Sequence, residues 1–191
     1  MKRITVPLSQ EDVIDLRSGD EVLLSGYIYT ARDQAHKRFL EAIKKKKKLP
    51  IGLNKQVIYY CAPTQPPSGK AAGISSALSA SGRRRSIRAV GSCGPTTSRR
   101  MDAFTIPLLK KGLKGMIGKG GRSANIRDAI KKYKAVYFLA PGGCGALISK
   151  YVESAQSIAY KDLGPERIMK LKVRDFPLIV GIDSKGRSFY G

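Results

Sequence analysis

Two kinds of hydrophobic pattern alternate along the chain. Short runs rich in β-branched and aromatic residues predict strands at 4–7, 21–30, 56–62, 113–117, 134–140, 157–160 and 177–182, the last followed by a hairpin turn at 183–186. Between them, apolar positions at helical spacing or helix-capping residues predict helices after Ser9, at about 33–47, 105–111, 124–132 and 165–171, and from about Gly145. Strands that alternate with helices predict an α/β domain.

The helix predicted at about 33–47 has the clearest one-sided pattern. Its apolar face is formed by residues at positions i, i+3, i+4 and i+7, namely His36, Phe39, Leu40 and Ile43. Pro50 is expected to close this helix, because proline cannot continue one. The helix predicted at 165–171 has Pro165 in its first turn, where proline is tolerated.

The interval 63–88 differs in composition from the rest of the chain. It contains the pair Pro66-Pro67, nine Ser and Gly residues between Ser68 and Ser86, and the run Arg83-Arg84-Arg85. Few apolar groups there can offset the entropy of ordering the backbone. We therefore predict one domain over residues 1–191 that carries a flexible basic insertion at about 66–88, with a functional lid as the alternative.

Length and composition limit the classes of protein that this chain can represent. Its 191 residues, of which 42% are hydrophobic, suit one globular domain and argue against a wholly disordered polycation. No apolar run reaches the length of a membrane-spanning helix, and the N-terminus does not resemble a signal peptide. The three cysteines show no CxxC pairing, so neither a disulfide framework nor a zinc site is predicted. We expect no membrane association and a cytoplasmic location.

The charge is strongly positive, with 36 Lys and Arg residues against 14 Asp and Glu, a net charge of +22. Such a field attracts anions, and nucleic acid is the first partner to consider. However, only 7% of residues are aromatic and none is Trp, so no basic–aromatic run is available to stack bases. A nucleic-acid-binding protein is therefore kept only as the alternative from another functional class. A small dianionic substrate or an acidic partner subunit would use the same field.

Three predicted strand-to-helix junctions carry residues that could perform chemistry, and open α/β sheets bind ligands at such junctions. At the first, Arg32 stands at the start of a helix and could clamp a carboxylate in bidentate fashion. Asp33 and His36 share a helix face, so the carboxylate could orient the imidazole and favour its protonated form. His36 is the only histidine, hence a candidate acid or base near neutral pH. The alternative is that His36 is simply a polar member of the helix stripe.

The second and third junctions offer anion-binding groups. In 94–102, the hydroxyl residues Thr96, Thr97 and Ser98 precede two arginines near a helix start, which would suit a carboxylate or phosphate or simply cap the helix. In 118–123, glycines flank Lys119 and would let backbone approach a ligand, although a helix-capping turn fits equally well. This segment is not a Walker A loop, because Gly120 follows the lysine.

The cysteines raise the question of an iron–sulfur cluster, since three thiolates can hold a [4Fe–4S] cluster. Cys61, Cys93 and Cys144 are 32 and 51 residues apart, which gives no local ligand spacing. We therefore predict no metal ligands in this chain and expect ordinary buried thiols.

Taken together, these motifs resemble the β subunit of the class I, iron–sulfur-dependent fumarate hydratase and L-tartrate dehydratase family. The matching segments cover almost the whole chain: TARDQAHKR at 30–38, GSCGPTTSRRMD at 91–102, GLKGMIGKGGRS at 112–123, VYFLAPGGCGAL at 136–147, and DLGPERI with DFPLIVGIDSKG within 162–186. The insertion at 68–88 departs from the pattern, which has a much shorter link there.

The resemblance implies a single swivelling β/β/α domain with three layers, in which helices flank a mixed sheet. It also implies a separate iron–sulfur α subunit that carries the [4Fe–4S] cluster and assembles with this chain as an α2β2 heterotetramer. The expected reaction is the reversible hydration of fumarate to (S)-malate, with L-tartrate dehydration as the alternative. Because the metal site lies in the partner, this chain alone is expected to be inactive.

The resemblance further implies roles for individual residues. Arg32, Arg100 and Lys119 would bind the substrate carboxylates, with Thr97, Gly118 and Gly120 in the same substrate-binding segments. Thr96 would lie at the reacting carbon, paired with an acidic residue of the other subunit for proton abstraction. His36, with Asp33 beside it, is the second candidate for proton transfer, and an ordinary pKa near neutrality favours it over a threonine.

Overall fold

The computed structural model describes residues 1–66 and 89–190. The strands are β1 (Lys2–Val6), β2 (Glu21–Thr30), β3 (Val57–Tyr59), β4 (Gly115–Gly118), β5 (Val136–Leu139), β6 (Val152–Ala159) and β7 (Ile168–Ile182). The α-helices are α1 (Gln10–Asp15), α2 (Asp33–Lys44), α3 (Asp102–Lys110), α4 (Ala124–Tyr133) and α5 (Gly145–Ile148); three 3-10 helices are η1 (Ser98–Met101), η2 (Ser149–Tyr151) and η3 (Lys161–Glu166). Apart from its first residue, the insertion predicted at about 66–88 lies outside the described residues.

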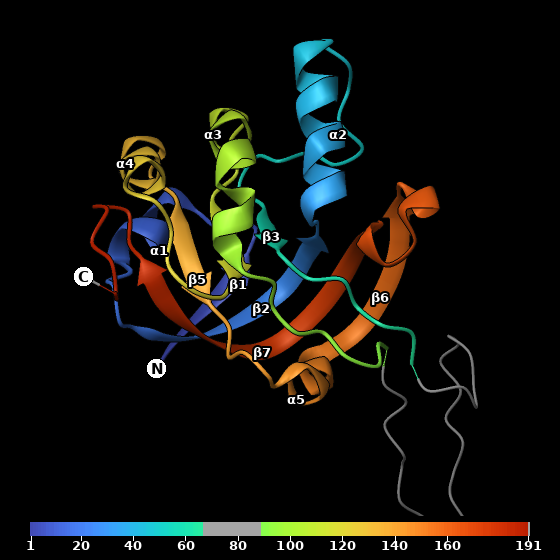
Figure 1. Ribbon diagram of the computed structural model, residues 1–191. Helices are drawn as coiled ribbons and strands as arrows, with labels where there is room; N and C mark the ends of the chain where they lie inside the picture. The colour runs from blue at the N-terminus through green and yellow to red at the C-terminus, as the bar shows by residue number, and fades with distance from the viewer. Residues whose placement is uncertain (67–88, 191) are drawn as a thin grey trace, which may run out of the picture.

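The strands form one mixed sheet in the order β1-β2-β3-β4-β5-β7-β6. Strands β1 to β5 pair in parallel, whereas β7 runs antiparallel to β2, β5 and β6. Because β7 pairs with β2 as well as with β5, the sheet closes on itself (Figure 1). The parallel strands β2, β3 and β4 consequently end at the same edge of the sheet.

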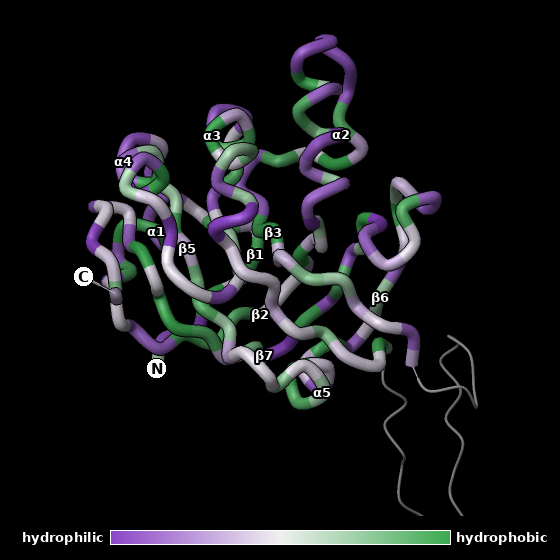
Figure 2. Tube along the Cα trace, viewed as in Figure 1, coloured by the Kyte–Doolittle hydropathy of each residue, from purple (hydrophilic) through white to green (hydrophobic). Residues whose placement is uncertain are grey.

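Two hydrophobic cores lie on opposite sides of the strands. Successive residues of the β3 segment alternate between them: Tyr59 and Cys61 belong to the core that joins all seven strands, and Ile58 and Tyr60 to the core beneath the helices. The second core packs against α2, α3 and α4, which lie side by side over one face of the sheet (Figure 1). The buried apolar residues of these helices, among them Phe39, Leu108 and Ile130, belong to this second core. Figure 2 shows that α2 ends in a hydrophilic turn.

The sequence-based prediction of an α/β domain with a mixed sheet and flanking helices is confirmed, and a closed sheet with one helical layer is compatible with a single β/β/α domain. The strand predicted at 21–30 matches β2 residue for residue. Ser9 caps α1 as expected, and with Asp12 it forms a reciprocal capping box. In the described residues, no helix has both the length and the apolar character needed to cross a membrane.

The helix predicted at 165–171 is wrong. Pro165 belongs to η3, and from Ile168 onward the chain is the long strand β7. The segment MKLKV, residues 169–173, alternates between apolar and charged residues with a period of two. Its backbone pairs with β2 on one side and with β6 on the other. The short strand predicted at 157–160 is likewise the end of the longer strand β6.

The turn predicted at 183–186 is confirmed and is organised by one buried carboxylate. Asp183 accepts hydrogen bonds from the backbone N–H groups of Ser18, Lys185 and Arg187 and from Nε of Arg187, the last at 2.7 Å. Burial alone would raise the pKa of Asp183, but the bond from the Arg187 side chain and those from the backbone outweigh it and lower that pKa below its ordinary value. The turn is thereby fastened to the segment before β2.

We expect Asp183→Asn to lower the free energy of unfolding by about 2 kcal/mol at pH 7, because an amide cannot accept all the donors that meet this carboxylate. Urea denaturation measures the change. Asp175→Asn is the matched control: its carboxylate pairs with Arg3 at the surface, and Asn tolerates its φ of 49°, so a loss under about 1 kcal/mol is expected. Equal losses in the two variants would contradict this role of Asp183 in the turn.

Candidate active site

The three junctions singled out in the sequence meet at one edge of the sheet. The backbone N–H of Ala31, directly after β2, donates to the Tyr59 carbonyl at 3.1 Å, and that of Thr96 donates to the Tyr60 carbonyl at 2.7 Å. The N–H of Lys119, directly after β4, donates in turn to the Thr96 carbonyl at 3.2 Å. Backbone hydrogen bonds therefore place the segments that carry Arg32, Thr96 and Lys119 next to one another.

A buried ion pair joins the second and third of these segments, 94–102 and 118–123. Arg122, whose side chain is 0% exposed, donates from Nε to Oδ1 of Asp102 at 2.6 Å, and Oδ2 of Asp102 accepts the Ser123 N–H at 2.9 Å. The guanidinium also lies over the rings of Tyr60 and Tyr137, at 5.5 and 5.2 Å. Neither charged residue was assigned a role from the sequence, because nothing local in the sequence shows that they are partners.

Asp33 pairs with both of the arginines that were predicted to bind substrate. Its Oδ1 accepts a hydrogen bond from Nε of Arg100 at 3.1 Å, and its Oδ2 lies 3.0 Å from Nη2 of Arg100 and 3.6 Å from Nη2 of Arg32. Only 18% of the Asp33 side chain is exposed. The two guanidinium groups thus converge on one internal carboxylate, an arrangement that could equally hold a carboxylate from outside.

Arg32, Arg100 and Lys119, here called the cation cluster, keep hydrogen-bond donors that no carboxylate of the described residues uses. Nε of Arg32 is buried without a hydrogen-bond partner among the described residues. The Arg100 side chain is 54% exposed, and Lys119 makes no ion pair with any carboxylate in the described parts of the chain. Arginine donors and a lysine ammonium left in this state suit a bound anion.

His36 lies beneath the cluster and not at its surface. Its side chain is completely buried, and Nδ1 lies 2.8 Å from the Arg32 carbonyl. Because a carbonyl can only accept, Nδ1 carries the proton, which leaves Nε2 as a buried lone pair without a partner in the described structure. The ring packs among aromatic side chains, namely Phe39, Tyr60 and Phe104.

The charge of Asp33 favours the protonated form of His36, as expected from the sequence, but burial of the ring outweighs this effect. Burial lowers the pKa of His36 from 6.5 to about 4, and the Arg122 charge acts in the same direction. The bond to the Arg32 carbonyl and the charge of Asp33 oppose this shift without cancelling it. His36 is therefore neutral at pH 7, and Asp33 bonds the arginines instead of the imidazole.

The predicted substrate-binding glycines differ in their surroundings. A Cβ at Gly118 would lie 1.9 Å from Oγ of Ser98 and 3.0 Å from the Tyr60 ring, so the missing side chain allows close internal packing. Gly120 has a φ of +77°, a Cβ added there would have no atom within 4 Å, and its carbonyl accepts a hydrogen bond from the Tyr137 hydroxyl. Thr97 is exposed and pairs through its backbone with Lys119.

The cysteines do not form a metal centre. Cys61 and Cys93 are buried with their sulfur atoms 3.4 Å apart, and burial raises the pKa of the Cys61 thiol well above its usual value. Cys144 is only partly buried, and the described residues contain no group of three His, Cys, Asp or Glu side chains that could hold a metal ion. These residues therefore do not fit a [4Fe–4S] cluster.

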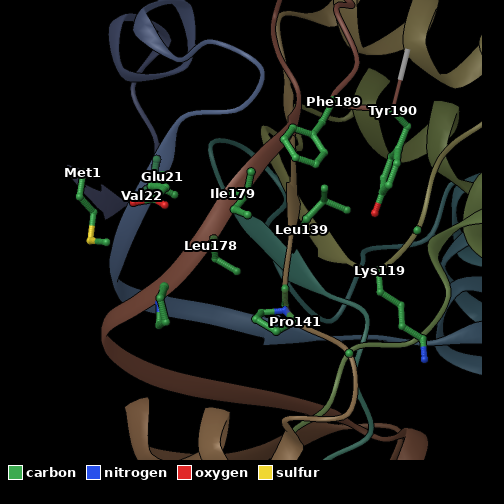
Figure 3. A pocket seen from close by; sticks show the side chains of 14 residues that line it. Met1, Glu21, Val22, Lys119, Leu139, Pro141, Leu178, Ile179, Phe189 and Tyr190 are labelled. Carbon is green, nitrogen blue, oxygen red and sulfur yellow. The ribbon is translucent and has the colours of Figure 1, made fainter.

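An apolar pocket of about 440 Å³ adjoins the cluster (Figure 3). Leu139, Leu178, Phe189 and Tyr190 line it, while Lys119 stands at its margin with the ammonium group directed away from the apolar side chains (Figure 3). Neither Arg32 nor Arg100 reaches this pocket. Of the predicted carboxylate-binding cations, only Lys119 therefore borders this pocket.

The pKa of His36 predicts a pH dependence of stability. Between pH 6.5 and about 4 the unfolded chain binds a proton at this residue that the folded protein does not, so acidification costs about 3 kcal/mol through His36. We expect His36→Phe to lose about that much less stability than the wild type between pH 7 and pH 4, as measured by urea denaturation. Titration of the carboxylates is common to both proteins, so parallel curves would contradict the assignment.

Comparison with known proteins supplies the family. The family model described as "Fumarase C-terminus" matches residues 1–191. "Putative L(+)-tartrate dehydratase subunit beta" of Methanocaldococcus jannaschii is 38% identical over 187 residues, 96% of this chain and 88% of the relative. "L(+)-tartrate dehydratase subunit beta" of Escherichia coli K12 is 33% identical over 192 residues, 98% of this chain and 86% of the relative.

A longer protein shows the same similarity. "Putative fumarate hydratase class I" of Geobacillus stearothermophilus is 30% identical over 189 residues, which cover 98% of this chain but 33% of that relative. The whole-length family match and these identities agree with the motifs that meet at the carboxyl edge of the sheet. The chain belongs to the Fumarase C-terminus family, whose members include β subunits of the fumarate hydratase and tartrate dehydratase group of hydro-lyases.

Proposed function

We propose that this chain is the β subunit of a hydro-lyase that interconverts fumarate and (S)-malate. The observation that carries the proposal is the convergence of Arg32 and Arg100 on the single carboxylate of Asp33, at an edge that also presents Lys119. A four-carbon dicarboxylate needs cations at both of its ends and a proton-transfer group between them. The cluster provides such cations within one short stretch of the sheet edge.

Thr96 is the proposed proton-transfer residue of this chain. Its backbone is fixed on both sides, by the bond from its N–H to the Tyr60 carbonyl and by the bond that its carbonyl accepts from the Lys119 N–H. Complete burial keeps the His36 ring away from a bound substrate, which favours Thr96 over His36. Addition of water to fumarate places a hydroxyl on one central carbon and a proton on the other. Thr96 and an acidic residue of the partner would donate that proton, and would abstract it in the reverse reaction.

A partner α subunit is proposed to complete the site. Two of the relatives are named as β subunits, and the third relative is a longer chain of which this sequence matches one third. When assembled, the partner's [4Fe–4S] cluster would supply Lewis-acid chemistry at the hydroxyl that is added or removed. Since the cysteines of this chain do not fit an iron–sulfur cluster, we expect this chain alone to be inactive. We also propose that the complex contains two copies of each subunit.

L(+)-tartrate is the second candidate substrate. The relatives at 38% and 33% identity are both named for L(+)-tartrate dehydratase, whereas the relative named for fumarate hydratase is 30% identical. Loss of water from tartrate gives the enol of oxaloacetate. This reaction also requires that both carboxylates of the substrate are bound by cations. The choice between the substrates depends on the second hydroxyl of tartrate and on groups that the partner contributes.

The test is an anaerobic assay of the chain with its reconstituted iron–sulfur partner, in which malate formation from fumarate is followed. We expect turnover only when both chains are present, and a fall in kcat of about 100-fold or more in Thr96→Val, because a proton-transfer group has been removed. Thr5→Val, on the exposed face of β1, is the matched control and should keep full activity.

Three other outcomes of this assay are informative. Turnover of tartrate without turnover of fumarate would change the proposed substrate and leave the roles of Arg32, Arg100, Lys119 and Thr96 unchanged. Full activity of Thr96→Val would remove that residue from the mechanism. Absence of turnover with both substrates, in a complex whose iron–sulfur cluster is intact, would overturn the proposed function.

A further inference from the structure

We propose that Glu166 is a positioning residue that fixes Arg32 for carboxylate binding. This inference rests on the proposed function for the role of Arg32. Glu166 belongs to η3, the short segment between β6 and β7. It lies 134 residues further along the chain than Arg32. In Figure 1 this segment, drawn in orange after β6, lies beside the start of α2.

The η3 segment is held against the first half of α2 by contacts that do not involve Glu166. Nη1 of Arg38, in α2, donates to Asp162 Oδ1 at 2.9 Å, and the same guanidinium lies 5.0 Å above the Tyr160 ring. After η3, the Met169 N–H donates to the Thr30 hydroxyl at 3.0 Å and so ties the start of β7 to the end of β2. The position of Glu166 is therefore set by its neighbours in the chain.

Glu166 provides a cap that α2 lacks locally. The N-cap residue of α2 is Arg32, whose side chain makes no capping hydrogen bond. The first backbone N–H groups of a helix need acceptors from outside the helix. Oε2 of Glu166 accepts the Gln34 N–H at 2.9 Å, and a carboxylate at this end of the helix also complements its dipole.

The same carboxylate holds the arginine. Oε1 of Glu166 lies 3.6 Å from Nη2 of Arg32, and Asp33 lies at the same distance from that atom. Two carboxylates thus face the Nη2 end of the guanidinium, while Nε remains buried without a partner in the described structure. The side chains of Arg32 and Glu166 are 24% and 22% exposed, so this contact is partly shielded from solvent. Glu166 thereby keeps the remaining donors of Arg32 available for a substrate carboxylate.

The test compares Glu166→Gln with Asp162→Asn in the assembled complex. Glutamine keeps an oxygen that can accept the Gln34 N–H but loses the charge that faces Arg32. We expect KM for the dicarboxylate to rise about tenfold in Glu166→Gln with kcat within about twofold of wild type, because substrate binding is weakened while proton transfer is kept. Asp162→Asn loosens the same segment without touching Arg32, and its KM should stay within about twofold of wild type.

A double variant separates positioning from a general structural effect. In an Arg32→Lys background, Glu166→Gln should change KM by less than about twofold, since its target is gone. A full tenfold effect in that background, or equal effects of Glu166→Gln and Asp162→Asn in the wild-type background, would overturn the proposal.

A second readout keeps this inference separate from the proposed function. The Nε–H of Arg32 is observed by ¹⁵N nuclear magnetic resonance in the full chain, without substrate. Its hydrogen exchange should be faster in Glu166→Gln than in the wild type and unchanged in Asp162→Asn. If the complex turns over neither substrate but this difference is found, the proposed function fails and the positioning of Arg32 by Glu166 stands; equal exchange in all three proteins would overturn the positioning.

Discussion

The buried ion pair between Arg122 and Asp102 is the interaction on which the site depends. Arg122 lies three residues after Lys119, and Asp102 lies two residues after Arg100, so one contact fixes the segments that carry both cations. The pair has no access to solvent on the arginine side, and Nη2 of Arg122 also donates to Thr105 at 2.7 Å. Loss of one partner would leave a buried charge uncompensated, at a cost of about 3–5 kcal/mol.

Internal carboxylates, and not the net charge, organise the cations of the site. Asp33 pairs with Arg32 and Arg100, the arginines proposed to bind the substrate, and Glu166 also pairs with Arg32. Asp102 likewise pairs with the buried Arg122. The lysines in the last turns of α2, α3 and α4 lie at the opposite ends of helices that begin near the site, where they complement the helix dipoles. The charge of +22 therefore says little about where the substrate binds.

Local signals in the sequence predicted the elements that form from local interactions. The run at 21–30, rich in Val, Leu, Ile and Tyr, and the cap at Ser9 are examples. The parallel order of β2, β3 and β4 accounts for the meeting of the three junctions. The helix predicted at 165–171 failed because Pro165 was interpreted as a helix start, although the period-two alternation at 169–173 is typical of a strand and pairs on both sides. Glu166 was missed, and the protonation of His36 misjudged, because partners distant in the sequence and burial decide both.

The most direct test of the central claim is a structure of the assembled complex with bound succinate, a dicarboxylate with neither a double bond nor a hydroxyl to react. We predict that its carboxylates lie within hydrogen-bonding distance of Arg32, Arg100 and Lys119, with Thr96 beside the central carbons. Succinate bound in the apolar pocket between Leu139 and Phe189, or held without these cations, would contradict that claim.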